Sequence, residues 1–166
     1  MKIPKTLKTL KCRLCGNKNL LKIYSFGNLF VSNFVSKKNI RKGVKAPLDL
    51  IYCKRCKLLQ LQHSAPQEIM YKKFYWNRSG ITKTMKDALK NIYLTVKKMS
   101  ILKKGDSVLD IGANDGTLLK YFKKDKYITI GCEPAKNLTK LLKKNCKYIL
   151  KNFWNSKDLK KILGNK

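Results

Sequence analysis

Apolar side chains recur at three- and four-residue steps through one stretch in the middle of the chain. The positions are Ile81, Met85, Ala88, Leu89, Ile92, Val96 and Met99. These steps put the side chains on one face of a helix, because an α-helix turns once every 3.6 residues. The pattern predicts an amphipathic helix, and Lys103-Lys104-Gly105-Asp106 after it predicts a turn.

After this turn, short apolar runs alternate with segments of helical periodicity. The expected order is strand Ser107–Ile111, helix Thr117–Phe122, strand Tyr127–Cys132, helix Ala135–Lys144, strand Tyr148–Leu150 and a last helix opened by Ser156 as its N-cap. Strands that alternate with helices form a parallel sheet with crossover helices. We therefore predict an α/β fold for this half, as a partial, truncated Rossmann-like sheet at residues 101–166.

The first part of the chain follows a different pattern. Short β-like runs at Leu21–Tyr24, Asn28–Val35 and Leu48–Cys53 are separated by glycine and proline, and two Cys-x-x-Cys pairs frame them. We expect a small β module at residues 1–66 and a helical connector at residues 67–100.

The two cysteine pairs are Cys12-Arg-Leu-Cys15 and Cys53-Lys-Arg-Cys56. Two thiolates three residues apart on a tight turn can face one tetrahedral zinc ion, and a second pair closes the site. Four thiolates leave no open coordination position, so the ion is expected to be structural and to fold a module too small to fold alone.

The residue after each pair is informative. Gly16 follows the first pair, where the backbone often needs a positive φ, which glycine adopts without strain. Lys57 stands at the same place after the second pair, which predicts either strain or a slightly different turn. The single histidine, His63, is expected to be an ordinary surface or partly buried residue rather than a metal ligand or a proton shuttle.

The chain has 39 lysines and arginines against 9 acidic residues, a net charge of +30. Such a charge suggests a nucleic-acid partner, but the cations are almost all lysine and are scattered rather than clustered, so this partner is not favoured. No apolar run is long enough for a membrane span and the N-terminus has no signal-peptide pattern. With cysteines paired for metal, a cytoplasmic protein is expected.

The stretch Asp110 to Leu119, DIGANDGTLL, predicts a strand that runs into a glycine loop and a helix. Gly112, Asn114 and Gly116 stand at alternate positions. A dinucleotide loop needs Gly-x-Gly-x-x-Gly, and the second and third glycines are missing here. The loop fits Asp/Glu-x-Gly-x-x-x-Gly better, the loop that holds S-adenosylmethionine in class I methyltransferases. Asp110 would lie near the cofactor's positive charge.

The next strand ends in Gly131-Cys132-Glu133-Pro134, 23 residues after Asp110. An acidic side chain at this place can accept hydrogen bonds from both ribose hydroxyls of a nucleotide. Of the few acidic residues in the chain, Asp110, Asp115 and Glu133 fall at the expected cofactor positions. The alternative is that they are solvated loop carboxylates.

These motifs together resemble the zinc-containing sugar C-methyltransferases. The resemblance covers roughly residues 12–155 and includes CRLCG, YCKRCKLLQLQH, FYWNRSGITKTM, VLDIGANDGTLL, GCEPAKNL and NFWN. It implies an N-terminal zinc module, a methyltransferase domain that binds S-adenosylmethionine, and a nucleotide-linked keto-deoxysugar as substrate. The implied reaction removes a proton next to a keto group, and the enolate attacks the methyl group.

The resemblance also implies two aromatic site residues. Tyr75 is the nearest match to the family's catalytic tyrosine, although Asn77 stands where a second aromatic is usual, and a core role for Tyr75 is the alternative. Phe153 matches an aromatic residue that flanks the adenine.

The family's catalytic His/Glu segment and its C-terminal substrate domain would lie beyond the equivalent of Lys166. We therefore expect the N-terminal portion of an enzyme, inactive unless a separately encoded C-terminal half completes it. Three alternatives stay open: a zinc-ribbon nucleic-acid-binding protein, a fragment of a ribosomal RNA base methyltransferase, and a non-catalytic remnant.

Overall fold

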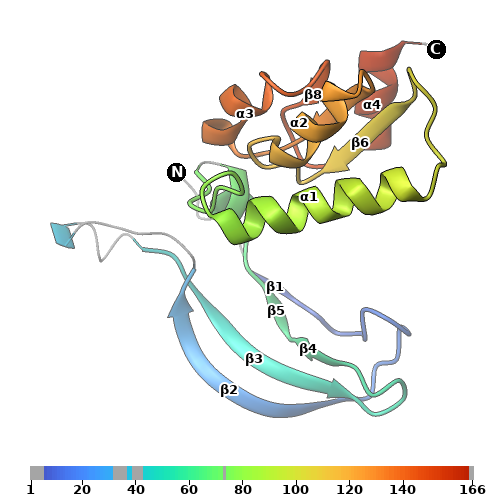
Figure 1. Ribbon diagram of the computed structural model, residues 1–166. Helices are drawn as coiled ribbons and strands as arrows, with labels where there is room; N and C mark the ends of the chain where they lie inside the picture. The colour runs from blue at the N-terminus through green and yellow to red at the C-terminus, as the bar shows by residue number, and fades with distance from the viewer. Residues whose placement is uncertain (1–5, 32–36, 39–42, 73, 165–166) are drawn as a thin grey trace. The chain divides into compact units, whose positions relative to one another are not determined.

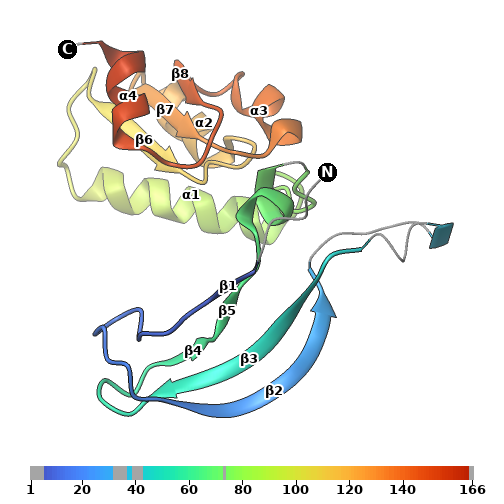
Figure 2. The same ribbon diagram turned by 180° about the vertical axis from the view of Figure 1, so that it is seen from behind.

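The computed structural model describes residues 6–31, 37–38, 43–72 and 74–164. The chain divides into two compact units, Met1–Met70 and Tyr71–Lys166 (Figures 1 and 2). Each unit is described by itself below. The boundaries predicted from the sequence, with a separate connector at residues 67–100, stay a prediction.

The first unit is built from antiparallel strands. Strands β2 (Leu20–Phe30), β3 (Lys45–Cys53) and β4 (Leu59–Leu61) form one sheet in that order, and β1 (Leu7–Lys8) pairs with β5 (His63–Ser64). Gly27 has a φ of 76° where the register of β2 against β3 shifts between Ser25 and Asn28. The glycine therefore forms a bulge inside one strand instead of ending it.

The β-like runs Leu21–Tyr24 and Leu48–Cys53 lie inside β2 and β3. The run Asn28–Val35 begins in β2, but residues 32–35 lie outside the described part of the chain.

Few apolar side chains are buried in the first unit. Among its described residues these are Cys12, Val31, Ile51 and Cys53. Two of the four belong to the predicted zinc site, so a metal ion would do here much of what an apolar core does in a larger domain.

A short π-helical turn, η2 (Glu68–Lys72), begins in the first unit and ends in the second. The first α-helix of the second unit is α1 (Lys83–Lys98). The Thr82 side chain caps α1 by accepting the Met85 backbone N–H at 3.3 Å. The Tyr93 hydroxyl donates to Asp125 Oδ2 at 2.6 Å, and Lys97 Nζ lies 2.7 Å from the same oxygen. These contacts hold α1 on the helix that follows the first parallel strand.

The rest of the second unit alternates strands and helices. The elements are β6 (Ser107–Ile111), α2 (Thr117–Lys124), β7 (Ile128–Cys132), α3 (Lys136–Leu142), β8 (Tyr148–Leu150) and α4 (Ser156–Leu163). The three strands are parallel, in the order β6-β7-β8. The predicted order of elements is confirmed, and the bounds of β6 and β8 agree with the prediction.

The N-cap predicted for the last helix is wrong. Asn155 is the capping residue, and its side chain accepts the Lys157 backbone N–H at 2.9 Å. Ser156 is the first helical residue, because Asn155 is extended and places its carbonyl oxygen over the open N–H groups of the first turn.

Side chains are buried on both faces of the parallel sheet. Leu119 of α2 and Leu142 of α3 pack with Ala113 and Cys146 on one face. Leu159 and Leu163 of α4 pack against Ile130, Cys132 and Leu150 on the other. The unit is thus a three-stranded parallel sheet between helices, as the α/β prediction requires. None of the described helices has the length and apolar character needed to cross a membrane.

Candidate functional site

The four predicted zinc ligands lie together. The Sγ atoms of Cys12, Cys15, Cys53 and Cys56 are all within 4.8 Å of one another. The shortest separations are 3.4 Å between Cys12 and Cys56 and 3.6 Å between Cys15 and Cys53. Four thiolates about 2.3 Å from one zinc ion at tetrahedral angles would be about 3.8 Å apart. The cluster therefore has the size and the donor set of a structural zinc site.

Both cysteine pairs lie on the same kind of turn. The Gly16 N–H donates to the Cys12 carbonyl at 2.9 Å, and the Lys57 N–H donates to the Cys53 carbonyl at 2.9 Å. Gly16 has a φ of 71° and Lys57 a φ of 66°. Of the two outcomes expected for Lys57, the structure shows the strained one: lysine adopts the left-handed conformation.

The surroundings of the thiols favour anionic sulfur at some positions and not at others. The backbone N–H of Cys56 is the main reason that the pKa of Cys53 falls to about 6. The backbone N–H of Cys15 likewise lowers the pKa of Cys12. At Cys56 the Leu58 N–H also lowers the pKa, but burial and the three neighbouring thiols together raise it to about 12. The last proton is thus hard to remove without a cation in the cluster.

His63 takes no part in the cysteine cluster. Its Nδ1 lies 3.5 Å from Asp49 Oδ2, and both side chains are largely buried. The Ser25 hydroxyl also donates to Asp49 and is the main reason that the pKa of this carboxyl is lowered. The contacts join three strands of the first unit, which agrees with the structural interpretation of the histidine.

In the second unit, the glycine loop of residues 112–116 lies at the carboxyl end of β6, beside the end of β7. The Gly112 and Ala113 N–H groups donate to the Cys132 carbonyl at 2.9 and 3.0 Å. Glu133 Oε2 accepts the Asn114 N–H at 2.9 Å, and Oε1 accepts the Ala135 N–H at 2.8 Å. The loop and the acidic strand end predicted from sequence are therefore in direct contact.

The alternate positions of the loop share one backbone conformation. Gly112, Asn114 and Gly116 have φ values of 81°, 53° and 79°. A Cβ on Gly116 would lie 2.9 Å from Leu142 Cδ1, so this glycine is needed for packing. A Cβ on Gly112 would meet no atom within 4 Å, so the loop faces open space there. A ligand could approach the backbone closely at Gly112.

Asp110 and Glu133 form a pair of carboxyl groups without a counter-charge. Burial raises the pKa of Asp110, and the charge of Glu133 raises it further. Within the described residues, neither carboxylate lies within ion-pair distance of a lysine or arginine, although the chain has a net charge of +30. These two carboxyl groups are therefore open to a cationic ligand.

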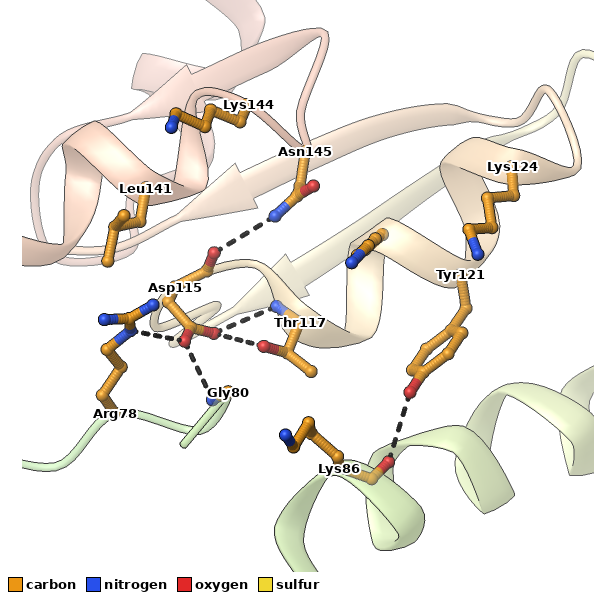
Figure 3. A pocket seen from close by; sticks show the side chains of 11 residues that line it. Arg78, Gly80, Lys86, Asp115, Thr117, Tyr121, Lys124, Leu141, Lys144 and Asn145 are labelled. Atoms are coloured by element: carbon orange, nitrogen blue, oxygen red, sulfur yellow. Dashed lines mark hydrogen bonds and ion pairs between the residues drawn. The ribbon is translucent and has the colours of Figure 1, made fainter. Parts of the chain in front are cut away.

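The side chain of Asp115, another predicted cofactor residue, is buried and bonded within the protein. It is 5% exposed, and its Oδ1 accepts the Thr117 hydroxyl and N–H at 2.6 and 3.1 Å. Its Oδ2 accepts the Gly80 N–H at 2.8 Å and the Arg78 Nε at 3.2 Å. Burial raises its pKa, but the Thr117 hydroxyl, the Gly80 N–H and the other donors lower it below the ordinary value. All four acceptor positions of this carboxylate are thus occupied by the protein (Figure 3).

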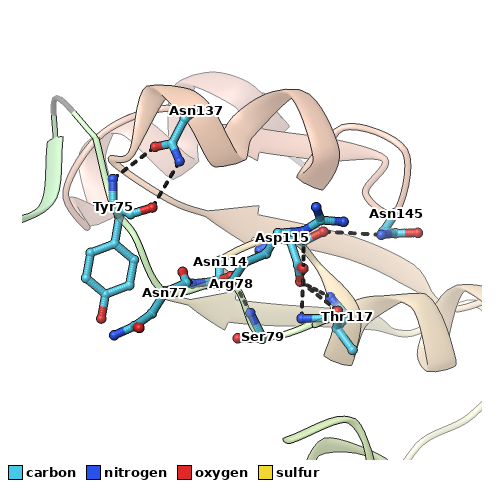
Figure 4. Close-up of polar contacts among 10 residues, drawn as sticks. Tyr75, Asn77, Arg78, Ser79, Asn114, Asp115, Thr117, Asn137 and Asn145 are labelled. Carbon is cyan, nitrogen blue, oxygen red and sulfur yellow. Dashed lines mark hydrogen bonds and ion pairs between the residues drawn. The ribbon is translucent and has the colours of Figure 1, made fainter. Parts of the chain in front are cut away.

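Residues 75–80, which we call the strap, are held to the loop and to α3 by side-chain amides and a carboxylate (Figure 4). Asn137 accepts the Tyr75 N–H and donates to the Tyr75 carbonyl, both at 3.0 Å. Asn114 accepts the Ser79 N–H and donates to the Asn77 carbonyl, also at 3.0 Å. Together with the bond from the Gly80 N–H to Asp115, these bonds fix the strap along its length.

Sequence reasoning did not single out Asn137 or Gly80. A Cβ on Gly80 would lie 2.6 Å from Asp115 Oδ2, so only glycine fits against the loop. This glycine, at the end of the strap and directly before the predicted helix, was a visible signal of a close approach. Asn137 gave only a weak signal, as an amide at the start of a helix.

The two aromatic candidates lie near this region. Tyr75 is half-buried, its ring centroid is 5.8 Å from that of Tyr71, and its ring points away from Asp115 in Figure 4. Phe153 follows β8 and is half-buried, with Lys72 Nζ 5.9 Å from its ring centroid. The cofactor and catalytic roles expected for these residues stay predictions.

Residues 12–71 match a family model that carries a methyltransferase name and the description "Putative zinc binding domain". The chain is also 28% identical over 130 residues to C-methyltransferase NovU of Streptomyces niveus. This alignment covers 77% of the chain and 31% of that protein, so the chain spans about a third of the length of the curated relative it matches. The resemblance to zinc-binding C-methyltransferases is confirmed.

Proposed function

We propose, from its resemblance to a zinc-binding C-methyltransferase, that this chain supplies the zinc module and the S-adenosylmethionine-binding portion of such an enzyme. The zinc ion would be held by the four clustered cysteines and would stabilise the first unit. The cofactor would lie against the glycine loop and Glu133 of the second unit. The comparisons support the methyltransferase part of this proposal. The geometry and charge of the site support the choice of cofactor.

The uncompensated pair Asp110 and Glu133 carries the cofactor proposal. Two neighbouring carboxyl groups at the end of a parallel sheet, without a cationic partner in the described chain, fit a ligand that brings its own positive charge. S-adenosylmethionine has a sulfonium and an ammonium group. A dinucleotide would instead need the second and third glycines of Gly-x-Gly-x-x-Gly, which this loop lacks.

The residues of the site have separate tasks in this proposal. Each oxygen of Glu133 accepts one backbone N–H and keeps a second lone pair for a ribose hydroxyl. Gly112 leaves the backbone open to close approach, and Phe153 would flank the adenine. Asp115 acts through the protein: it positions the strap and does not need to contact the cofactor.

For the substrate we propose a small molecule with a keto group, a nucleotide-linked keto-deoxysugar by the resemblance noted from the sequence. The bound cofactor would supply the methyl group. The chemistry needs a base for the proton next to the keto group and donors for the oxygen of the enolate. Tyr75 is the candidate for donating a hydrogen bond to this oxygen. Asn137 fixes its position by bonding both the N–H and the carbonyl of Tyr75.

Calorimetric titration of the zinc-loaded chain with S-adenosylhomocysteine tests the cofactor proposal. We expect binding in the micromolar range. The Glu133→Gln variant should bind about 10- to 100-fold more weakly, because a charge-assisted hydrogen bond contributes about 1.5–3 kcal/mol. Asp87→Asn makes the same change of charge at an exposed position of α1 and should leave the affinity unchanged.

Two results would contradict this proposal. Binding weaker than millimolar, with a normal circular dichroism spectrum, would support the non-catalytic remnant. RNA binding that falls steeply between 50 and 200 mM salt, in a chain that ignores S-adenosylhomocysteine, would support the nucleic-acid alternative, because phosphate contacts release counterions.

A further inference from the structure

A cavity of about 610 Å³ lies in the second unit, bordered by α1, α2, the end of α3 and the strap (Figure 3). Five cationic side chains line it: Arg78, Lys86, Lys120, Lys124 and Lys144. They come from four different segments of the chain. The tertiary structure therefore gathers these charges, and no run of lysines in the sequence accounts for them.

The lining has little negative charge to offset them. Asp115 is the one carboxylate among the residues that line this cavity, and its four acceptor positions are already occupied by Thr117, Gly80 and Arg78. Lys120 and Lys124 are four residues apart on α2, a spacing at which like charges repel. Five cations around one concave surface repel one another, and an anion bound among them would relieve this repulsion.

Arg78 is suited to contact such an anion. It bonds Asp115 through Nε, which leaves Nη1 and Nη2 without a partner in the described part of the chain. A guanidinium fork binds phosphate oxygens in pairs, and the lysines add point charges around it. The Tyr121 and Asn145 side chains also line the cavity and bring further polar groups.

We propose that this cavity binds a small anion that carries two or more phosphate groups. Its volume is in the range of small-molecule sites, and one carboxylate or one phosphate would leave most of the five cations uncompensated. The site is separate from the proposed cofactor site, whose carboxyl pair, Asp110 and Glu133, favours the opposite charge. The inference therefore goes beyond the proposed function and does not depend on it.

The test is calorimetric titration of the full chain with inorganic pyrophosphate at 0.15 M salt. We expect micromolar binding of pyrophosphate and binding of inorganic phosphate at least tenfold weaker. The double variant Lys120→Gln/Lys124→Gln should weaken pyrophosphate binding at least tenfold. The control Lys157→Gln/Lys160→Gln removes the same charge from exposed positions of α4 and should change the affinity less than twofold.

Three outcomes would overturn the proposal. Equal losses in the two double variants would mean that the net charge of the chain attracts anions without a site. Absence of pyrophosphate binding at millimolar concentration would mean that the cavity is not an anion site. Tighter binding of a short single-stranded RNA, unchanged by the cavity variant, would assign the charges to a different partner. The same variants titrated with S-adenosylhomocysteine keep this result distinct from the cofactor proposal.

Discussion

At the scale of single residues, the two metal-binding turns show how much one side chain matters when the backbone is fixed. Gly16 and Lys57 occupy equivalent places, with the same hydrogen bond and almost the same φ. Glycine reaches this conformation freely, whereas an L-residue with a Cβ loses roughly 1–2 kcal/mol there. The requirement comes from the two thiolates, which must point at one centre.

We predict that Lys57→Gly raises the free energy of unfolding of the first unit, by at most about 1 kcal/mol, because relief of strain is partly offset by the greater freedom of glycine when unfolded. Gly16→Ala should lower it by about 1 kcal/mol. A Cβ on Gly16 would meet no atom within 4 Å, so its effect reports φ alone. Urea unfolding of the zinc-loaded chain measures both. A loss of stability in Lys57→Gly would show that the lysine side chain itself, which bonds the Lys54 carbonyl at 3.0 Å, outweighs the strain.

At the scale of elements, polar side chains join the strap to the glycine loop and to α3. Asn114, Asp115 and Asn137 each bond backbone groups of the strap. Bonds of this kind need a set geometry, so they fix the position of Tyr75 relative to the loop more closely than apolar contacts would. The acidic member of the set also makes the arrangement depend on pH.

We predict that Asp115→Asn lowers the free energy of unfolding by about 1–3 kcal/mol at pH 7, since at least one buried donor loses its acceptor. The pKa of Asp115 is lowered in the folded chain, so its contribution is complete above the unfolded value of about 4. It is lost as the pH falls through the lowered value. The gap between variant and parent should therefore shrink as the pH falls below about 4.

Urea unfolding at a series of pH values measures this gap. The matched control, Asp87→Asn, removes an exposed carboxylate of α1 and should change stability by less than about 0.5 kcal/mol. A gap that stays constant down to pH 2 would mean that Asp115 acts through its shape and not through its charge.

At the scale of the whole molecule, the two units depend on different sources of stability. The second unit has apolar clusters on both faces of its sheet. The first has few buried apolar residues among those described, and two of them are cysteines of the metal cluster. Zinc binding by four thiolates contributes about 10–16 kcal/mol at pH 7, which is enough to decide whether such a unit folds.

We predict that the purified chain holds one zinc ion and that a strong chelator unfolds the first unit alone. Hydrogen exchange should show loss of protection in β2 and β3, with protection retained in β6 and β7. Cys15→Ser should reproduce the effect of the chelator. Cys146 lies in the second unit, so the Cys146→Ala variant should still bind the metal. Loss of protection in both units, or much less than one zinc per chain, would contradict this assignment.

The sequence by itself determined the elements and the local chemistry. Periodicity predicted the order of strands and helices in the second unit, and the spacing of the cysteines predicted the metal cluster. Both patterns depend on neighbours within one or two turns of chain, which side-chain spacing records directly. The glycine loop after β6 was predicted from its motif, and the structure shows that Gly112 and Gly116 both have positive φ there.

Only the tertiary structure decided which side chains meet. Asn137 binds Tyr75 from 62 residues away. Asp115, predicted as a cofactor residue, turns toward the strap, where the closely approaching Gly80 donates its backbone N–H to the carboxylate. The five cations of the cavity are spread over four segments and become neighbours only when those segments pack together. Pairings at such separations follow from how whole elements pack, and local spacing does not encode them.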